Sequence, residues 1–348
     1  MKSIKNLFGL FFCMAVISAC GNDDGDTNGV LEKNFISVEN GEYNEGSLPV
    51  GTNENLIESA SFDSKALPGG SSYLELNSTE ELDYLNVSVK DVSGYFKVKL
   101  ENPEIVPPTS RVGSSYRYTI IITISQNLEK DFTLEYTIVS KNGDVSPKYS
   151  SDVEYVKAGT GVLQVNLKFN NEKDVDLHVE EPDGNVINYW NCFPSQSEEY
   201  EKLLSWEDDD NITEEQWESL FGRVGLDIDS NAGCDIDGIN SENVFFEKDC
   251  MQKGKYNVYV NLFDNCDPRI ATDYVVRVIY KGKEIAKNEG RFEIGAEGNG
   301  DDENLANLVK VLDFTIDEGL QAVKSRTELS GRAHLLKGEF KMLINKNN

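Results

Sequence analysis

Apolar side chains recur at every second position in several segments of the chain, and this period constrains the fold more than any other feature. The longest runs cover residues 116–124 and 132–138, and shorter ones cover residues 85–89 and 96–100. Because successive side chains of a strand point to opposite faces, a period of two predicts half-buried β-strands. Gly, Pro, Asn and Asp separate the runs, as turns between strands require.

Two packed sheets bury the apolar faces of such strands, so the sequence predicts an all-β fold of two β-sandwich domains. The chain length also fits two domains. We place an Ig-like sandwich at residues 32–156 and a second sandwich at residues 157–316, with a Lys-Ala-Gly-Thr-Gly hinge at residues 157–161. The first domain has no catalytic spacing, which indicates a spacer or an interaction module. The tail, residues 317–348, alternates only weakly and predicts no defined element.

The first twenty residues divide into a charged start, an apolar stretch and a short run of small residues that ends in a cysteine. Lys2 and Lys5 precede an almost wholly apolar stretch, residues 7–19. As a helix this stretch is about 20 Å long, short of the roughly 30 Å that a bilayer core needs. The Ile-Ser-Ala-Cys ending resembles a lipobox, which implies that residues 1–19 are removed as a signal peptide and that Cys20 is lipidated. An ordinary secretory signal with a chance cysteine is the alternative.

The segment that follows, residues 20–31, is acidic and unable to pack, so we expect a flexible tether. Its Gly-Asn-Asp-Asp-Gly-Asp sequence at residues 21–26 resembles the export signal of surface lipoproteins in the Bacteroidota. The resemblance implies a protein that is lipid-anchored in the outer membrane and faces the cell exterior. A tether without an addressing role is the alternative.

The formal net charge of -28 restricts the possible partners. An acidic surface repels nucleic acid and anionic lipid, which excludes DNA and RNA as partners. It attracts divalent cations locally. For most of the 61 acidic residues, however, solubility is the simpler interpretation.

A predicted strand at the start of the second domain carries a first acidic cluster. Its apolar residues at 175, 177 and 179 point inward, so Asp174, Asp176 and His178 share the opposite face. A Pro-Asp-Gly turn ends this strand at residues 182–184. The outer face of the strand therefore presents two carboxylates and one imidazole.

A second cluster has the Asp-x-Asp-x-Asn spacing of calcium loops that bind through oxygen: Asp227, Asp229 and Asn231. We expect this cluster to meet Asp174 and Asp176 in space and to hold a calcium ion. Carboxylate and amide oxygens select a hard cation, whereas zinc would prefer imidazole and thiolate ligands. The alternative is that both acidic strand edges only face solvent.

Four sequences in the second half occur in a specific order: DVDLHVEEPDG from residue 174, GLDIDSNAGC from 225, ENVFF from 242 and GKYNVYVNLFDNC from 254. Together they resemble an uncharacterised bacterial domain family that is similar in pattern to prepeptidase C-terminal domains and to the P domains of proprotein convertases. The resemblance implies a jelly-roll-like sandwich over residues 157–316. Several relatives of that pattern bind calcium, and none is catalytic in itself.

An insertion at residues 193–224 departs from the family pattern and is the only region of the chain with a helical pattern. Thr213 and Gln216 have the spacing of a capping box. The three tryptophans, Trp190, Trp206 and Trp217, lie in or beside this insertion. They predict either a ligand-binding platform on which sugars stack or a set of anchors that pin the insertion onto the sandwich.

Four cysteines remain in the mature second domain, and an exported domain favours two disulfides among them. Three connectivities are open. The family resemblance places a cysteine at both Cys234 and Cys266, which implies that these two pair and leaves Cys192 with Cys250. A metal site of cysteines is less favoured because the chain has no Cys-x-x-Cys pair.

Signatures of enzymes are missing: the mature chain has only His178 and His334, and it lacks zinc-protease, serine-hydrolase and phosphate-loop motifs. We therefore predict a non-enzymatic cell-surface lipoprotein, stabilised by calcium, that acts as a binding, adhesion or accessory module for a glycan or protein ligand. The alternatives are a glycan-binding accessory lipoprotein of a polysaccharide-uptake system and a cryptic hydrolase.

Overall fold

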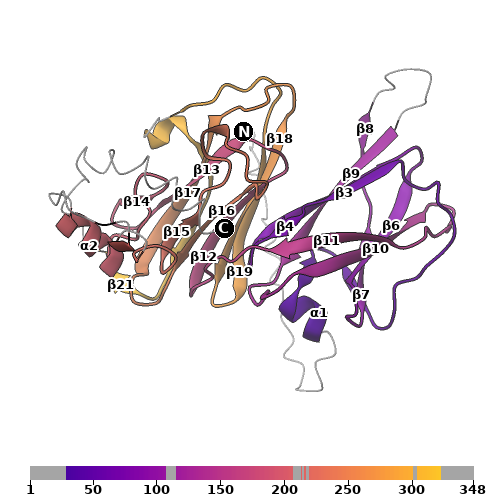
Figure 1. Ribbon diagram of the computed structural model, residues 1–348, viewed down its shortest axis with the longest axis horizontal. Coiled ribbons are helices and arrows are strands. Elements are labelled where there is room, and N and C mark those ends of the chain that lie inside the picture. The colour runs from indigo at the N-terminus through magenta and orange to yellow at the C-terminus, as the bar shows by residue number, and fades with distance from the viewer. Residues whose placement is uncertain are drawn as a thin grey trace, which may run out of the picture.

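Nearly all of the regular secondary structure is β-strand, in four sheets that pair into two sandwiches lying side by side (Figure 1). The predicted all-β class, two sandwiches with a short helix in the second, is confirmed. Among the helices that the structure describes, none is long and apolar enough to cross a membrane. The computed structural model describes residues 29–106, 115–206, 213, 215–216, 219–300 and 304–322.

The first sandwich is built from β1 to β11. One sheet has the order β1 (Ile36–Val38), β9 (Ser115–Ile124), β5 (Ser71–Ser78), β3 (Ser59–Phe62), and β8 (Glu104–Val106) also pairs with β9. The other has the order β2 (Glu42–Asn44), β7 (Tyr95–Lys99), β6 (Leu82–Val89), β10 (Phe132–Ser140), β11 (Tyr149–Tyr155), β4 (Lys65–Ala66). Every pairing is antiparallel except that of β11 with β4.

The core of this sandwich follows from the period of two. The runs at residues 116–124 and 132–138 become β9 and β10, and their alternate side chains, such as Ile122 and Leu134, are buried between the sheets. Helix α1 (Gly29–Asn34) begins ahead of the predicted domain start at residue 32, and Leu31 from this helix joins the same core.

The second sandwich is built from β12 to β21. One sheet has the order β15 (Gly225–Ile228), β16 (Ser241–Phe246), β12 (Leu163–Phe169), β18 (Thr272–Tyr280), β19 (Lys283–Phe292). The other has the order β14 (Val186–Ile187), β13 (Asp174–Glu180), β17 (Gln252–Asp264), β20 (Val309–Ile316), and β21 (Leu320–Gln321) runs parallel to β17. Strand β21 lies beyond residue 316, so this sandwich extends into the segment predicted as a tail.

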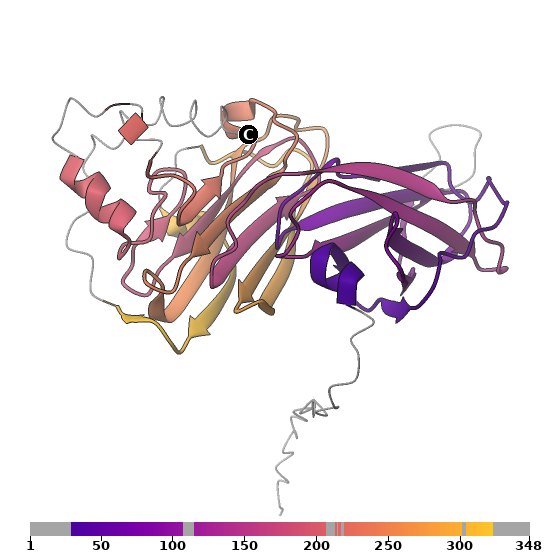
Figure 2. The same ribbon diagram turned by 60° about the horizontal axis from the view of Figure 1, so that its bottom comes forward.

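The inserted segment lies at the end of the second sandwich that is far from the first (Figure 2). Helix α2 (Glu198–Trp206) forms its first half, and Leu203, Leu204 and Trp206 from this helix pack against the core. Thr213 and Gln216 exchange the two hydrogen bonds of the predicted capping box, at 2.9 and 3.3 Å. The insertion is thus anchored by apolar side chains of α2.

The outer face of β12 packs against the end of the first sandwich, which explains why this strand is buried on both faces. Gln164 Nε2 donates to Pro68 O at 2.8 Å, and Arg277 Nη1 of β18 donates to the carbonyls of Gly69 and Gly70. Gly69 has a φ of 74°, and a Cβ there would lie 2.1 Å from Gln164 Oε1. Only glycine fits both this backbone conformation and this close approach.

Candidate metal centre

Three buried carboxylates from separate segments converge in the second sandwich. Asp176 lies on β13, Asp229 directly follows β15, and Glu242 lies on β16. One carboxylate oxygen from each lies within 4.8 Å of the others. Their relative exposures are only 3%, 6% and 1%, so the cluster is shielded from solvent. Such an arrangement is costly unless the charges are compensated.

The carboxylate cluster forms where β13 of one sheet lies against β16 of the facing sheet. Among the described strands, β14 pairs with β13 only at Val179 and Glu180. The earlier residues of β13 therefore have no described strand beside them on that edge. Glu242 shares the inward face of β16 with Val244 and Phe246, and its Oε2 accepts a hydrogen bond from Leu177 N at 2.6 Å. Glu242 therefore bridges the two sheets.

The second oxygen of Glu242 is the clearest sign that this group binds a ligand. Glu242 Oε1 is buried and has no hydrogen-bond partner in the described part of the chain. Burial raises the pKa of Glu242 well above its usual range, and the negative charges of Asp229 and Asp176 raise it further. A buried acceptor without a donor is rare in native proteins and calls for an ion or a water molecule.

The remaining residues of the predicted site shape the loop that carries Asp229. Asp174 accepts a hydrogen bond from Gly233 N. Asn231 has a left-handed backbone, and its side chain donates to Lys173 O at 3.0 Å and to Asn240 Oδ1 at 2.7 Å. Both predicted ligands therefore hold the loop in place, and neither belongs to the group of three converging carboxylates.

The expected partnership of Asp227 with Asp229 does not form. The register of β15 against β16 shifts between Leu226 and Ile228, so a bulge breaks the period of two and the side chains of Asp227 and Asp229 point in different directions. Its two oxygens accept hydrogen bonds from Gly159 N and from Asn243 Nδ2. Burial raises the pKa of Asp227 to about 7. Glu242, which was not among the predicted ligands, lies beside Asp176 and Asp229 where Asp227 was expected.

One of the two predicted disulfides is present. Cys234 and Cys266 are joined with a sulfur–sulfur distance of 2.02 Å, which confirms that pairing. The predicted bond between Cys192 and Cys250 is wrong: both side chains are buried but not linked. Each sulfur instead lies near a carbonyl of its own turn, Cys250 Sγ at 3.5 Å from Glu247 O.

His178 lies in the interior and not on an open face. Its exposure is 2%, its Nδ1 lies 3.2 Å from Asn188 Nδ2, and the Tyr189 ring meets it edge-on at 6.1 Å. Burial lowers the pKa of His178 to about 4, so the imidazole is neutral at physiological pH. The outer face of β13 was expected to meet solvent, but the 229–240 loop and the segment after β14 cover it.

The predicted ligand-binding tryptophans do not form one exposed platform among the described residues. Trp190 is partly buried and lies against Tyr189 with ring centroids 5.4 Å apart. Trp206 packs against the core from helix α2. Trp217 lies outside the described residues, as does Cys20, the predicted lipidation site.

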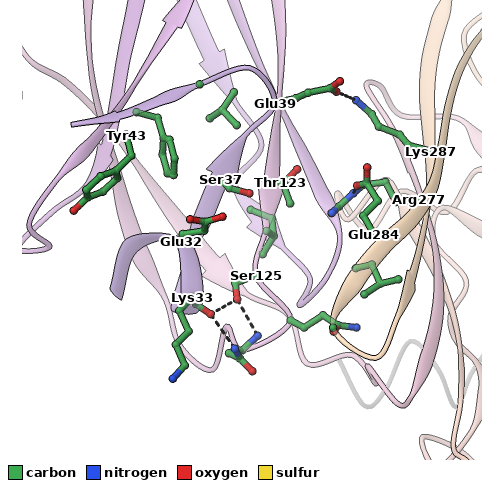
Figure 3. A pocket seen from close by; sticks show the side chains of 18 residues that line it. Glu32, Lys33, Ser37, Glu39, Tyr43, Thr123, Ser125, Arg277, Glu284 and Lys287 are labelled. Atoms are coloured by element: carbon green, nitrogen blue, oxygen red, sulfur yellow. Dashed lines mark hydrogen bonds and ion pairs between the residues drawn. The ribbon is translucent and has the colours of Figure 1, made fainter. Parts of the chain in front are cut away.

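A groove of about 720 Å³ separates the two sandwiches on one side of their contact (Figure 3). Lys287 from the second sandwich pairs with Glu39 from the first at 2.6 Å, and Arg277 pairs with Glu284 at 2.6 Å. These ion pairs satisfy charges along the walls. We therefore assign the groove to the contact between the sandwiches and not to a ligand.

The chain matches no protein-family model and no curated protein. Among solved structures, the collagen adhesin from S. aureus shares 8% sequence identity, with 70% of this chain and 93% of that chain covered and a TM-score of 0.13. A TM-score at this level carries no argument about the fold or the function of this chain.

Proposed function

We propose that this protein is a lipid-anchored, non-catalytic surface module whose second sandwich is stabilised by a bound calcium ion. The observation that carries the proposal is the buried group Asp176, Asp229 and Glu242, above all the unpartnered Glu242 Oε1. Asp176 lies far from Asp229 and Glu242 in the sequence, so one cation between them would tie β13, the 229–240 loop and β16 together. A structural cation site is the simplest role for charges buried this deeply.

Calcium fits this group better than zinc does. All three side chains are carboxylates, and hard oxygen ligands favour calcium or magnesium over metals that prefer nitrogen and sulfur. Calcium also tolerates irregular geometry and accepts water for its remaining positions, whereas magnesium demands a near-ideal octahedron.

Export to the cell surface is supported by two independent features. The lipobox-like segment ending at Cys20 and the acidic segment after it resemble those of surface lipoproteins. The Cys234–Cys266 disulfide is a bond that persists in oxidising compartments and is rare in the cytosol of mesophiles.

A binding or accessory role is favoured over catalysis and over sugar stacking. His178 is buried and neutral, and the carboxylate group is closed to a substrate of any size. The partly covered Trp190 and Trp206 serve as anchors of the insertion rather than as a stacking surface. We therefore favour an adhesion or accessory module with a protein ligand over the glycan-binding alternative.

Thermal unfolding tests the cation site. At a calcium concentration one hundred times its Kd, a cation bound only to the folded state stabilises it by about 2.7 kcal/mol. We expect this gain in the wild type and in Asp227→Asn, which changes a neighbouring carboxylate outside the group. Asp229→Asn and Glu242→Gln should abolish it. A melting temperature that chelator and calcium leave unchanged would refute the site.

Membrane fractionation tests the anchor separately. Cys20→Ser should release the protein from the outer membrane because the lipid is the anchor that we infer. A Cys20→Ser variant that still sediments with the outer membrane would contradict lipidation, whatever the outcome of the calcium experiment.

A further inference from the structure

We propose that the cation-binding loop, residues 229–240, is also the joint between the two sandwiches, so that calcium occupancy controls how firmly they are held together. The inference rests on the proposed calcium site and adds a regulatory consequence to it. It follows from contacts that the loop makes on its two opposite sides.

On one side, the loop contacts the first sandwich directly. Lys65 Nζ of β4 donates to Asp237 O at 3.0 Å. Lys168 Nζ, fully buried on the outer face of β12, donates to Ile239 O at 2.9 Å and lies 3.4 Å from Asp63 Oδ2 of the first sandwich. Two loop carbonyls thus accept hydrogen bonds from the ammonium groups that bridge the sandwiches.

A small apolar cluster reinforces the same contact. It contains Leu67 and Val156 from the first sandwich and Ile228 and Ile239 from the second, all buried. It is separate from both main cores. Ile228 immediately precedes the cation ligand Asp229, and Ile239 lies at the other end of the loop, so the cluster is built around the two ends of the loop.

On the other side, the loop is fixed to the cation group. Asp229 supplies one of the three carboxylates, and Gly233 N donates to Asp174 on β13. The disulfide at Cys234 ties the loop to the end of β17 as well. The position of the loop against β13 therefore depends on what compensates the clustered negative charge.

The two sides are connected by a rigid set of hydrogen bonds inside the loop. The backbone N–H groups of Asn231 and Asp237 each donate to the other residue's side chain at 3.1 Å, and Ile239 N donates to Asp237 Oδ1 at 2.7 Å. A displacement at Asp229 is thus passed to Asp237 and Ile239, the residues that Lys65 and Lys168 contact.

Without a cation, repulsion among the three carboxylates favours a loop that opens away from β13. Opening would weaken the bonds from Lys65 and Lys168 but leave the contacts of Arg277 and Lys287 with the first sandwich, because none of their partners lies in the loop. Those contacts line the groove of Figure 3. The sandwiches would stay joined at the groove and loosen at the loop.

Hydrogen exchange of the mature chain carrying Cys20→Ser, with calcium or with chelator, tests the coupling. Near saturation at one hundred times Kd, calcium should slow exchange in residues 229–240 by up to about 100-fold if opening of the loop limits exchange. It should also slow exchange, by a smaller factor, at residues 63–68 of the first sandwich.

Two matched lysine variants distinguish calcium binding by the loop from the effect of that binding on the first sandwich. Lys65→Met removes the bond to Asp237 O and should keep the protection of residues 229–240 while reducing that of residues 63–68. Lys287→Met removes an inter-sandwich contact outside the loop and should leave both effects unchanged. If calcium protects residues 229–240 of the wild type but not residues 63–68, the proposed coupling to the first sandwich is refuted and the calcium site is not. If calcium protects neither segment, both the coupling and the calcium site are refuted.

Discussion

The two sandwiches are built from similar strands but bury different chemistry. In the first, the buried polar residues that the structure describes are neutral, such as Asn86 and Thr137. Every buried Asp, Glu, Lys, Arg or His among the described residues lies in the second sandwich: Lys168, Lys173, Asp174, Asp176, His178, Glu181, Glu199, Asp229, Glu242 and Arg277. The first sandwich is therefore held by apolar packing, and the second also depends on compensated charge.

Burying charge is expensive, and a protein that does so must supply partners. The second sandwich has hydrogen-bond networks, a disulfide and, we propose, a cation. Its stability should therefore respond to pH, reductant and calcium more strongly than the stability of the first sandwich does. The three tryptophans at residues 190, 206 and 217 make this testable because their fluorescence reports on the second sandwich alone. Circular dichroism reports on both.

The largest expected effect is on apolar packing. Leu134→Ala, in the core of the first sandwich, should lower the free energy of unfolding by about 2–5 kcal/mol in circular dichroism because it leaves a cavity. The gain in stability from calcium, followed by tryptophan fluorescence, should persist. Leu167→Ala, equally buried in the second sandwich, is the matched control and should shift the fluorescence transition by a similar amount. A Leu134→Ala variant that is no longer stabilised by calcium would contradict the claim that calcium acts through the second sandwich.

The disulfide should have the next largest effect. It closes a loop of 32 residues, so replacing Cys234 and Cys266 by Ser should cost about 3–4 kcal/mol in the fluorescence-detected transition. Reductant should lower the stability of the wild type by a similar amount and leave that variant unchanged.

Cys192→Ala with Cys250→Ala provides the control for this experiment. Because these two cysteines are not linked, the double variant should keep the full response to reductant. Loss of the response in this variant would show that the stabilising disulfide had been assigned to the wrong pair.

The smallest expected effect is the change with pH in the stability of the second sandwich, measured in the presence of a chelator. Burial raises the pKa of Glu181 to about 8, that of Asp227 to about 7 and that of Glu242 above its usual range. A raised carboxyl pKa means that the folded state binds protons more tightly than the unfolded one. Stability should therefore rise by about 2 kcal/mol as the pH falls from about 8.5 to about 6.5.

Below that interval, His178 acts in the opposite direction. Its pKa is lowered to about 4, so stability is lost as the pH falls from the unfolded pKa of 6.5 towards 4. Glu181 and Asp227 go on adding stability down to their unfolded pKa values of about 4, so His178 should flatten the rise of the fluorescence melting temperature below pH 6.5 and not reverse it. Glu181→Gln should remove most of the rise above pH 6.5, and a wild-type stability that increases with pH in chelator would contradict the assignment.

The sequence by itself determined the strands and the fold class, because both depend on short-range patterns. The period of two at residues 116–124 specified which side chains of β9 are buried, and the Thr213 and Gln216 spacing specified a capping box. The pairing of Cys234 with Cys266 came from a family resemblance and not from spacing. All of these follow from a few neighbouring residues or from a known pattern.

Only the tertiary structure decided the membership of the carboxylate group. A single bulge after Leu226 gives Asp227 and Asp229 different directions, and period-two reasoning has no means of placing such a bulge. Glu242 was overlooked although it alternates with Val244 and Phe246, and an acidic residue at a core position of a strand is a usable signal. Its partners, Asp176 and Asp229, come from other segments. The meeting of Asp176 with Asp229 was expected from the sequence and is present, but the place of Glu242 beside them depends on the packing of the two sheets, which a local pattern does not encode.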